Sequence, residues 1–236
     1  MTAVQEARTT DDLKALAERA GRELEDATAL EILQWAAKTF GDRFCVTSSM
    51  EDAVVAHLAS RALPGVDVVF LDTGYHFPET IGTRDAVEAV MDVNVITLTP
   101  RQTVAEQDAE YGPKLHDRDP DLCCALRKVR PLEEGLEGYQ AWATGLRRDE
   151  SKTRANTPVV GWDEKRGKVK ISPIAKWSQE DVQTYVTEHG VLTNPLLMDG
   201  YASVGCAPCT RRVLEGEDAR AGRWAGRSKT ECGLHG

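Results

Sequence analysis

Short apolar segments alternate with amphipathic helical stretches along this chain, and this alternation constrains the fold more than any other feature. Helical periodicity marks residues 10–20 and 26–39, the second ending at Gly41, and later a region of about 51–61 and one after Pro78. The intervening apolar segments, typical of buried strands, are RFCVTSS, DVVFLDTG, VNVITLTP and YQAWATGLR. Such alternation predicts an α/β fold with a doubly wound, mainly parallel sheet, in which ligands bind at the carboxyl ends of the strands.

The length and composition are those of a globular enzyme. The chain has 236 residues, of which 41% are hydrophobic and 28% charged, enough to bury the core of one domain or of one domain with an appendage. No apolar run approaches the roughly 18 residues of a membrane span, and the N-terminus lacks the basic-then-apolar pattern of a signal peptide. We therefore expect a cytoplasmic protein that does not associate with membranes.

Charge is distributed unevenly. The formal net charge is −9, yet residues 147–176 hold nine Lys/Arg against four Asp/Glu, and residues 206–236 hold six against four. A nucleic-acid backbone requires a broad basic face, whereas two basic islands in an acidic chain suit a small anionic ligand. The alternative is that both islands are solvated loops.

Polar residues follow three of the predicted strands. Ser48 and Ser49 follow the first, where hydroxyls and the N-terminus of the next helix would bind phosphate or sulfate oxygens. The same pattern also fits an ordinary helix cap. Asp72 and Thr73 follow the second strand and could address a ribose or base, and Arg147 ends the fourth. The sequence thus predicts a ligand site at this edge of the sheet.

The cysteines form the most specific pattern. Cys123 and Cys124 are adjacent, and Cys206 and Cys209 form a C-x-x-C, so two separated segments supply four thiols. This is the ligand set of a [4Fe–4S] cluster or of a structural zinc ion, and adjacent cysteines favour the cluster. Six cysteines are too few for a disulfide scaffold. Cys45, between Phe and Val in the first strand, is predicted to be a core residue.

A lysine follows the cysteine pair on the same predicted helix. Lys128 is four residues after Cys124, and residues four apart share one face of an α-helix. The cation would therefore lie beside the cluster, between it and an anionic substrate. Without the cysteines, a solvated lysine would be the better interpretation.

Together these motifs identify a family. The CC pair followed by Lys128, the later C-x-x-C, the R-x-G-R-W ending at Trp224 and the terminal ECGLH resemble the iron–sulfur adenylyl-sulfate (APS) reductases. These belong to the phosphoadenylyl-sulfate reductase family, in the adenine nucleotide alpha hydrolase superfamily. The resemblance covers about residues 40–236. It implies reduction of adenosine 5′-phosphosulfate (APS) to sulfite and AMP, in sulfate assimilation, with electrons from thioredoxin.

The resemblance also assigns roles to residues of this sequence. It implies that Cys232 is the nucleophile, passing through a cysteine thiosulfonate, on a glycine-flanked tail that enters and leaves the site. The cluster ligands would be Cys123, Cys124, Cys206 and Cys209. The remaining roles would be phosphosulfate contacts by Lys128, Arg147, Arg220, Arg223 and His235, a phosphate loop of Ser48, Ser49, Glu51 and Asp52, and nucleoside contacts near Asp72, Thr73 and Gly74.

Two other functions share parts of this pattern. A 3′-phosphoadenylyl-sulfate (PAPS) reductase has the same tail but typically lacks the four cluster cysteines. A cluster-bearing, ATP-dependent sulfur-transfer enzyme that acts on tRNA would keep a glycine-rich loop where this chain has SSMED. The presence of the four cysteines and the lack of a glycine-rich loop both favour the APS reductase. We accordingly expect N-terminal helices over 1–40, a nucleotide-binding core over 41–205, and a cluster-binding segment with a mobile catalytic tail over 206–236.

Overall fold

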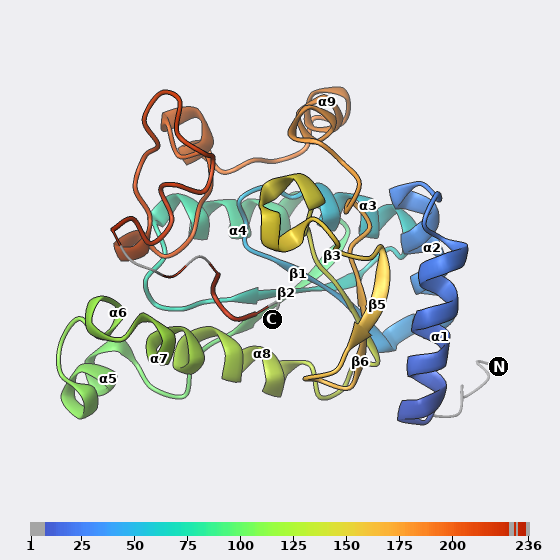
Figure 1. Cartoon of the computed structure of the whole chain (residues 1–236), viewed down its shortest axis with the longest axis horizontal. Coiled ribbons are helices and arrows are strands. Elements are labelled where there is room, and N and C mark those ends of the chain that lie inside the picture. Colours follow the sequence, from blue (N-terminus) through green and yellow to red (C-terminus); the bar gives the residue numbers. More distant parts are fainter. Residues whose placement is uncertain (1–7, 227–228, 230, 235–236) are drawn as a thin grey trace.

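The computed structural model describes residues 8–226, 229 and 231–234, and within them a six-stranded sheet forms the centre of the molecule (Figure 1). The strand order is β3-β2-β1-β4-β6-β5. Neighbouring strands are parallel except β5, which runs antiparallel to β6 at one edge. The strands are β1 Phe44–Ser48, β2 Val66–Leu71, β3 Val93–Leu98, β4 Ala141–Ala143, β5 Val160–Asp163 and β6 Lys168–Ile171. The predicted fold class is thus confirmed.

The sequence prediction found β1 to β4 and missed the edge hairpin. β5 and β6 are four residues each, and β5 exposes part of every residue after Val160. Their hairpin lies in the basic stretch 147–176, where charges obscure the alternation of buried and exposed residues. Gly167, with φ of +62°, provides the left-handed residue that the turn requires.

Helices cover both faces of the sheet, as Figure 1 shows with α3 and α4 on one side and α8 on the other. The first two helices begin at capping boxes made by Thr9 with Asp12 and by Thr28 with Glu31. The helices on the first face and at the sheet edge are α1 Thr10–Glu23, α2 Ala29–Phe40, α3 Val54–Ala62, α4 Pro78–Val90 and α9 Gln179–His189. The predicted helix of 51–61 begins three residues late, because residues 49–53 form a loop instead.

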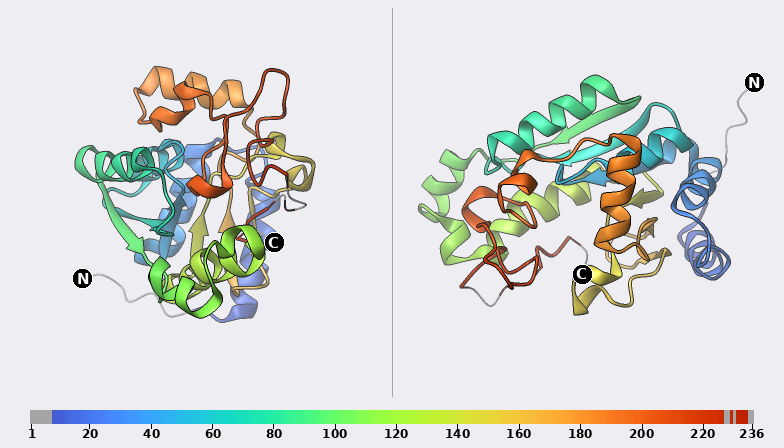
Figure 2. Two further views of the ribbon diagram at one scale, coloured as in Figure 1. Left: turned by 90° about the vertical axis from the view of Figure 1, so that its left-hand side faces the viewer. Right: turned by 90° about the horizontal axis from the view of Figure 1, so that it is seen from above.

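The second face carries a series of short helices, one of which ends in the cysteine pair. These are α5 Val104–Tyr111, α6 Leu115–Arg118, α7 Pro120–Cys124, a π-helical turn Ala125–Val129 and α8 Arg130–Gly135. In both views of Figure 2 the C-terminal segment lies beside these helices at one end of the sheet. None of the helices in the described residues has the length and apolar character needed to span a membrane.

Two apolar clusters form the core. The larger joins both N-terminal helices to the sheet, with Leu13, Leu33 and Val46 almost or fully inaccessible. The smaller one, on the other face of the sheet, centres on Cys45 and Trp142. Cys45 is fully buried, which confirms its predicted place in the core, and burial raises the pKa of its thiol.

Candidate active site

A cavity opens at the carboxyl ends of β1 and β4, where the sequence predicted a ligand site. It is bounded by the loop after β1, the π-helical turn, the loop after β4 and the C-terminal segment. The structure brings together in its wall nine of the residues predicted from sequence, namely Ser48, Ser49, Glu51, Asp52, Lys128, Arg147, Arg220, Arg223 and Cys232. Residues up to 187 positions apart, from Thr47 to Leu234, therefore share one cavity.

The loop after β1 is shaped by its own side chains. Ser48 Oγ accepts a hydrogen bond from the backbone N–H of Met50 at 3.1 Å, and Met50 has a φ of +57°. Asp52 Oδ1 accepts from the Val54 N–H at 2.9 Å and so caps α3. Ser49 is left exposed at the cavity. The loop thus holds its turn by hydrogen bonds to its own side chains.

Glu51 connects this loop to the C-terminal segment. Its Oε2 accepts hydrogen bonds from the Val204 N–H at 2.7 Å and from Ser203 Oγ at 3.3 Å. Burial raises the pKa of Glu51, and burial also raises the pKa of Asp52. Both carboxyl groups therefore accept hydrogen bonds within the protein and shape the wall of the cavity.

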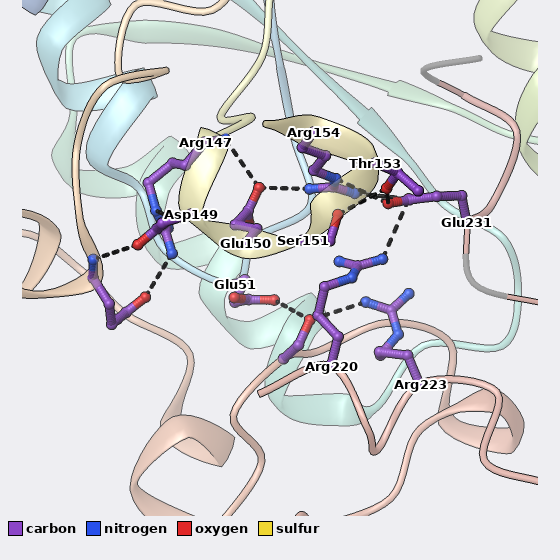
Figure 3. A network of polar contacts seen from close by, with 12 residues as sticks. Glu51, Arg147, Asp149, Glu150, Ser151, Thr153, Arg154, Arg220, Arg223 and Glu231 are labelled. Atoms are coloured by element: carbon purple, nitrogen blue, oxygen red, sulfur yellow. Dashed lines mark hydrogen bonds and ion pairs between the residues drawn. The ribbon is translucent and has the colours of Figure 1, made fainter. Parts of the chain in front are cut away.

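Arginine side chains approach the cavity from two directions. Arg147 is almost buried at the end of β4, where Nε pairs with Asp149 at 3.1 Å and Nη2 donates to Gln179 at 2.7 Å. Arg223 lies opposite, its Nη1 donating to Ser203 Oγ at 3.2 Å and to the Val204 carbonyl at 3.1 Å. Figure 3 shows these side chains on two sides of the network.

Arg223 retains hydrogen-bonding capacity. Its Nε is buried and has no hydrogen-bond partner among the described residues. Its guanidinium lies 4.8 Å from the ring centre of Trp224, a cation–π contact that fixes the plane of the group. A Cβ at Gly205 would collide with this guanidinium. Glycine is therefore required at 205 for Arg223 to hold this position.

The thiol of Cys232 lies in the cavity wall, on a tail that is docked. Leu234 packs against the smaller core cluster, and Glu231 pairs with Arg154 and Arg220. Lys229 pairs with Asp121 at the start of α7. The described part of the tail is therefore held in place in this structure, with Cys232 half-buried. His235, another predicted site residue, lies outside the described residues.

The four predicted cluster cysteines line a second, smaller pocket. Cys123 and Cys124 come from the end of α7, and Cys206 and Cys209 from a 3₁₀ turn. The turn is fixed by the Ala207 N–H, which donates to the Tyr75 carbonyl at 2.7 Å. Among the residues that the structure describes, no group of three or more His, Cys, Asp or Glu side chains is arranged to hold a single metal ion.

The thiols of this pocket differ in acidity. Burial, together with the other three thiols, raises the pKa of Cys123 to about 12, and burial also raises the pKa of Cys124. Burial opposes ionisation of Cys206 too, but the Lys128 charge and the Thr73 hydroxyl outweigh it and lower the pKa of Cys206. Thr73 Oγ1 lies 3.3 Å from Cys206 Sγ.

Lys128 lies between the two cavities and contributes to the wall of both. Burial alone would lower the pKa of its ammonium group, but the thiols of Cys206, Cys232 and Cys124 raise it. The α-helical spacing expected between Cys124 and Lys128 is wrong, because residues 125–129 form a π-helical turn. Such single turns widen the helix and occur often at functional sites. Lys128 nevertheless faces the cysteines.

Three residues predicted near the nucleoside, Asp72, Thr73 and Gly74, do not line the larger cavity. Thr73 is buried and lines the cysteine pocket. Asp72 Oδ1 accepts from the Gly74 N–H at 2.9 Å, and Gly74 has a φ of +71°, so these two residues form the turn after β2. Neither lines the larger cavity. The turn positions Thr73 toward Cys206, which the sequence pattern did not indicate.

Sequence reasoning missed Arg154 and Glu150, which also line the larger cavity. Arg154 is largely buried and pairs with Glu150 at 2.5 Å and with Glu231 at 2.8 Å. The available signal was the density of charge in RRDESKTR directly after the fourth strand. It was recognised as a basic island, but its carboxylates were not considered as partners.

Comparison with known proteins follows this geometry. Residues 43–212 match the family described as phosphoadenosine phosphosulfate reductase domain. The chain is 96% identical over 236 residues, all of both chains, to an adenosine 5′-phosphosulfate reductase of Streptomyces coelicolor. It is 58% identical over 227 residues, 96% of each chain, to the enzyme of that name from Mycolicibacterium smegmatis. A phosphoadenylyl-sulfate reductase from Candida auris, solved as a phosphate complex, superposes with a TM-score of 0.71 at 26% identity, over 88% of this chain and 98% of that one.

Proposed function

This chain belongs to the phosphoadenosine phosphosulfate reductase domain family, and we propose that it reduces APS to sulfite and AMP with Cys232 as the nucleophile. The observation that carries the proposal is the position of Cys232 in a cavity lined by Lys128, Arg147, Arg220 and Arg223. A thiol beside several cations suits attack on an anionic sulfuryl group, because the thiolate is the nucleophile and the cations bind the substrate oxygens.

The reaction balances in two steps. The Cys232 thiolate attacks the sulfur of APS, the bond from sulfur to the phosphate oxygen breaks, and AMP leaves with that electron pair, giving Cys–S–SO₃⁻. A thiolate of a dithiol reductant then attacks Cys232 Sγ, sulfite leaves, and the second thiol resolves the mixed disulfide. The reductant loses two electrons, and sulfur gains them as sulfite.

The cavity residues act on charge and orientation. The arginines neutralise the AMP phosphate as charge develops on it, which lowers the barrier in a water-poor site. Arg223 has an unused buried Nε for this purpose. Ser48 and Ser49 offer hydroxyl groups in the loop before the N-terminus of α3. His235 is proposed as a further contact to the phosphosulfate on the strength of the ECGLH motif.

The second pocket is proposed to hold one [4Fe–4S] cluster. Its four thiols come from two segments, its lining contains no carboxylate, and thiolates are the ligands that iron–sulfur clusters prefer. Cys123, Cys124, Cys206 and Cys209 would be the ligands. When bound, the group supplies a covalent tie between α7 and the 206–209 turn and negative charge beside Lys128. A structural zinc is the alternative that metal analysis distinguishes.

Thioredoxin is the proposed electron donor, and the cytoplasm the proposed compartment, because a small dithiol protein can reach a thiol carried on a terminal tail. Cys232 is half-buried when docked, so the tail has to leave the cavity for that second attack. The segments 1–40, 41–205 and 206–236 would then serve as packing helices, nucleotide-binding core, and cluster-binding and catalytic segment.

The test uses anaerobically purified protein and two nucleotides. Sulfur-labelled APS and sulfur-labelled PAPS are incubated with it separately, without and then with thioredoxin. We expect label on Cys232 that thioredoxin releases as sulfite, and a higher kcat/KM for APS. Equal or reversed values would reassign the substrate to PAPS and leave the chemistry standing. Absence of any protein-bound label from both nucleotides would overturn the proposal.

A further inference from the structure

The residue before the proposed nucleophile, Glu231, is held by an ionic network at the cavity. Glu231 Oε1 accepts from Arg154 Nε at 2.9 Å, and Oε2 accepts from Arg154 Nη2 at 2.8 Å. The same Oε2 lies 3.3 Å from Arg220 Nη2, and Thr153 Oγ1 donates to Oε1 at 3.4 Å. Figure 3 shows these groups converging on the tail from the loop after β4 and from the C-terminal segment.

The receiving arginine is itself fixed. Arg154 Nη1 donates to Glu150 Oε2 at 2.5 Å, and the same oxygen accepts from the Arg147 N–H at 2.9 Å. The Arg154 side chain is only 11% exposed and that of Glu231 28% exposed. A two-pronged guanidinium–carboxylate contact specifies direction as well as distance. Because Arg154 cannot shift, the Glu231 carboxylate fixes where the adjoining residue stands.

We propose that Glu231 is a positioning residue, and that its contact with Arg154 and Arg220 (the Glu231 clasp) holds Cys232 in the cavity and sets how often the tail leaves it. The catalytic consequence rests on the proposed function, whereas the docking itself does not. The clasp adds a distinct property, since Arg154 and Arg220 both line the cavity. While the tail is docked, the Glu231 carboxylate pairs with both arginines; when the tail leaves, Arg154 keeps its pair with Glu150.

Other contacts would not substitute for the clasp. Leu234 packs against the rim of the smaller core cluster, but an apolar contact allows sliding and rotation. Lys229 and Asp121 form a pair in which the aspartate side chain is 82% exposed, and such pairs contribute little. The Glu231 clasp is the least exposed ionic contact of the described tail, so we expect its loss to undock Cys232.

The experiment measures alkylation of Cys232 by iodoacetamide in the intact anaerobic protein, without nucleotide, followed by mass spectrometry of the C-terminal peptide. For Glu231→Gln, which keeps the size and removes the charge, we expect alkylation about tenfold faster, equivalent to loss of about one charge-assisted contact. Alkylation of the wild type should accelerate with added salt, because salt screens the clasp, whereas that of the variant should not.

The matched control is Glu217→Gln. Glu217 forms a comparable two-pronged pair with Arg211 in the same segment, at 2.8 and 2.9 Å, but does not touch the tail. Its alkylation rate and salt dependence should equal those of the wild type. A pH profile separates exposure from ionisation, since undocking raises the plateau rate and a changed thiol acidity moves only the midpoint. An unchanged plateau in Glu231→Gln would overturn the proposal.

Reaction with APS supplies the second readout. Formation of the Cys232 sulfonate should slow about tenfold in Glu231→Gln, while APS affinity measured in a Cys232→Ser background stays within about threefold. A wild type that never forms the sulfonate would refute the proposed function and leave the alkylation result intact. If the variant is alkylated faster but forms the sulfonate as fast as the wild type, Glu231 does not position Cys232 for the reaction.

Discussion

Different interactions stabilise the sheet and the C-terminal segment. The sheet and its helices bury a continuous apolar cluster, in which residues such as Leu33 and Ile171 are wholly inaccessible. In the C-terminal segment, the described residues 199–226, 229 and 231–234 contain short turns joined by ion pairs, including Arg211 with Glu217 and Arg212 with Asp199. Apolar burial of that extent is lost only by unfolding, whereas paired charges at a surface break and reform locally.

This difference suits the proposed nucleophile, Cys232, which would have to lie in a closed site for one step and outside it for the next. A tail packed by apolar side chains alone would either stay or unfold part of the core. Ion pairs allow it to detach while the sheet keeps Arg147 and the β1 loop in place. The cysteine pocket lies at the junction, with two of its thiols from each region.

The largest effect is expected from a substitution in the C-terminal segment that abolishes catalysis and leaves the fold intact. Cys232→Ser should abolish sulfite formation, because a hydroxyl is far less ionised than a thiol at neutral pH. The melting temperature should stay within about 2 °C of the wild type, since Cys232 is a partly exposed tail residue. Sulfite release and calorimetry measure the two outcomes.

Cys45→Ala provides the converse variant. Cys45 is fully buried in the smaller core cluster, so this change should lower the melting temperature and leave sulfite formation intact. A sulfonate adduct on Cys45, or an active Cys232→Ser protein, would show that the tail does not carry the nucleophile.

The next effect concerns the junction between the regions. Cys206→Ser should remove iron and sulfide that we expect at about four each per chain in the wild type. Amide hydrogen exchange should accelerate in residues 199–226 and in α7, while β1 and β2 remain protected, because the ligands join one region to the other. Near-stoichiometric zinc in the wild type, with no iron, would identify the other metal; uniform loss of protection would show that the two regions unfold together.

A smaller effect is expected from displacing one cation within the C-terminal region. Gly205→Ala places a methyl group where the Arg223 guanidinium lies, so the guanidinium has to move from its bonds to Ser203 and Val204. We expect APS affinity to fall by about tenfold, the loss of one charge-assisted contact. Equilibrium binding in a Cys232→Ser background measures it.

Gly82→Ala is the control for that substitution. Gly82 lies in α4 and a Cβ there meets no atom within 4 Å, so affinity should not change and stability should rise slightly. Unchanged affinity in Gly205→Ala as well would mean that Arg223 does not contact the nucleotide.

The sheet region could be predicted from sequence better than the C-terminal region, because apolar burial stabilises the one and ion pairs hold the other. Strands such as VDVVFL carry their own signal, because apolar burial depends on composition and local period. The Glu231 clasp depends on residues 77 positions apart, and any of several carboxylates in the basic islands could have supplied it. Likewise, the side of the β2 turn that Thr73 faces follows from Asp72 and Gly74 geometry, which no periodicity encodes.

The grouping of the four cysteines in one pocket was predictable for another reason. Thiol spacing is rare enough to be informative without a fold, whereas Ser48, Glu51 and Asp52 serve equally as loop residues or helix caps. The structure gives Glu51 and Asp52 such supporting roles. The π-helical turn could not be predicted, since residues 125–129 have no proline or glycine to mark it.

The smallest effect is expected at the amine of Lys170, which lines a pocket together with Glu231 and Gly233 of the tail. Burial lowers the pKa of Lys170 in β6 to about 8, against an ordinary value of 10.5, although the neighbouring Asp163 favours the charge. Between these two values the unfolded chain binds more protons than the folded one, so this group's contribution to stability rises with pH from about 8 to 10.5. Below pH 8 the full cost of burying a charged amine applies.

Lys170→Met removes that cost and keeps the length of the side chain, so the melting temperature of the anaerobic protein should rise by about 2–4 °C at pH 7. The advantage should shrink at pH 9.5, because the wild-type amine is then mostly neutral when folded. Lys176→Met removes the same charge from a more exposed pair with Asp26 and should show no such pH dependence. An equal shift at both pH values for Lys170→Met would mean that packing, and not the buried charge, sets the difference.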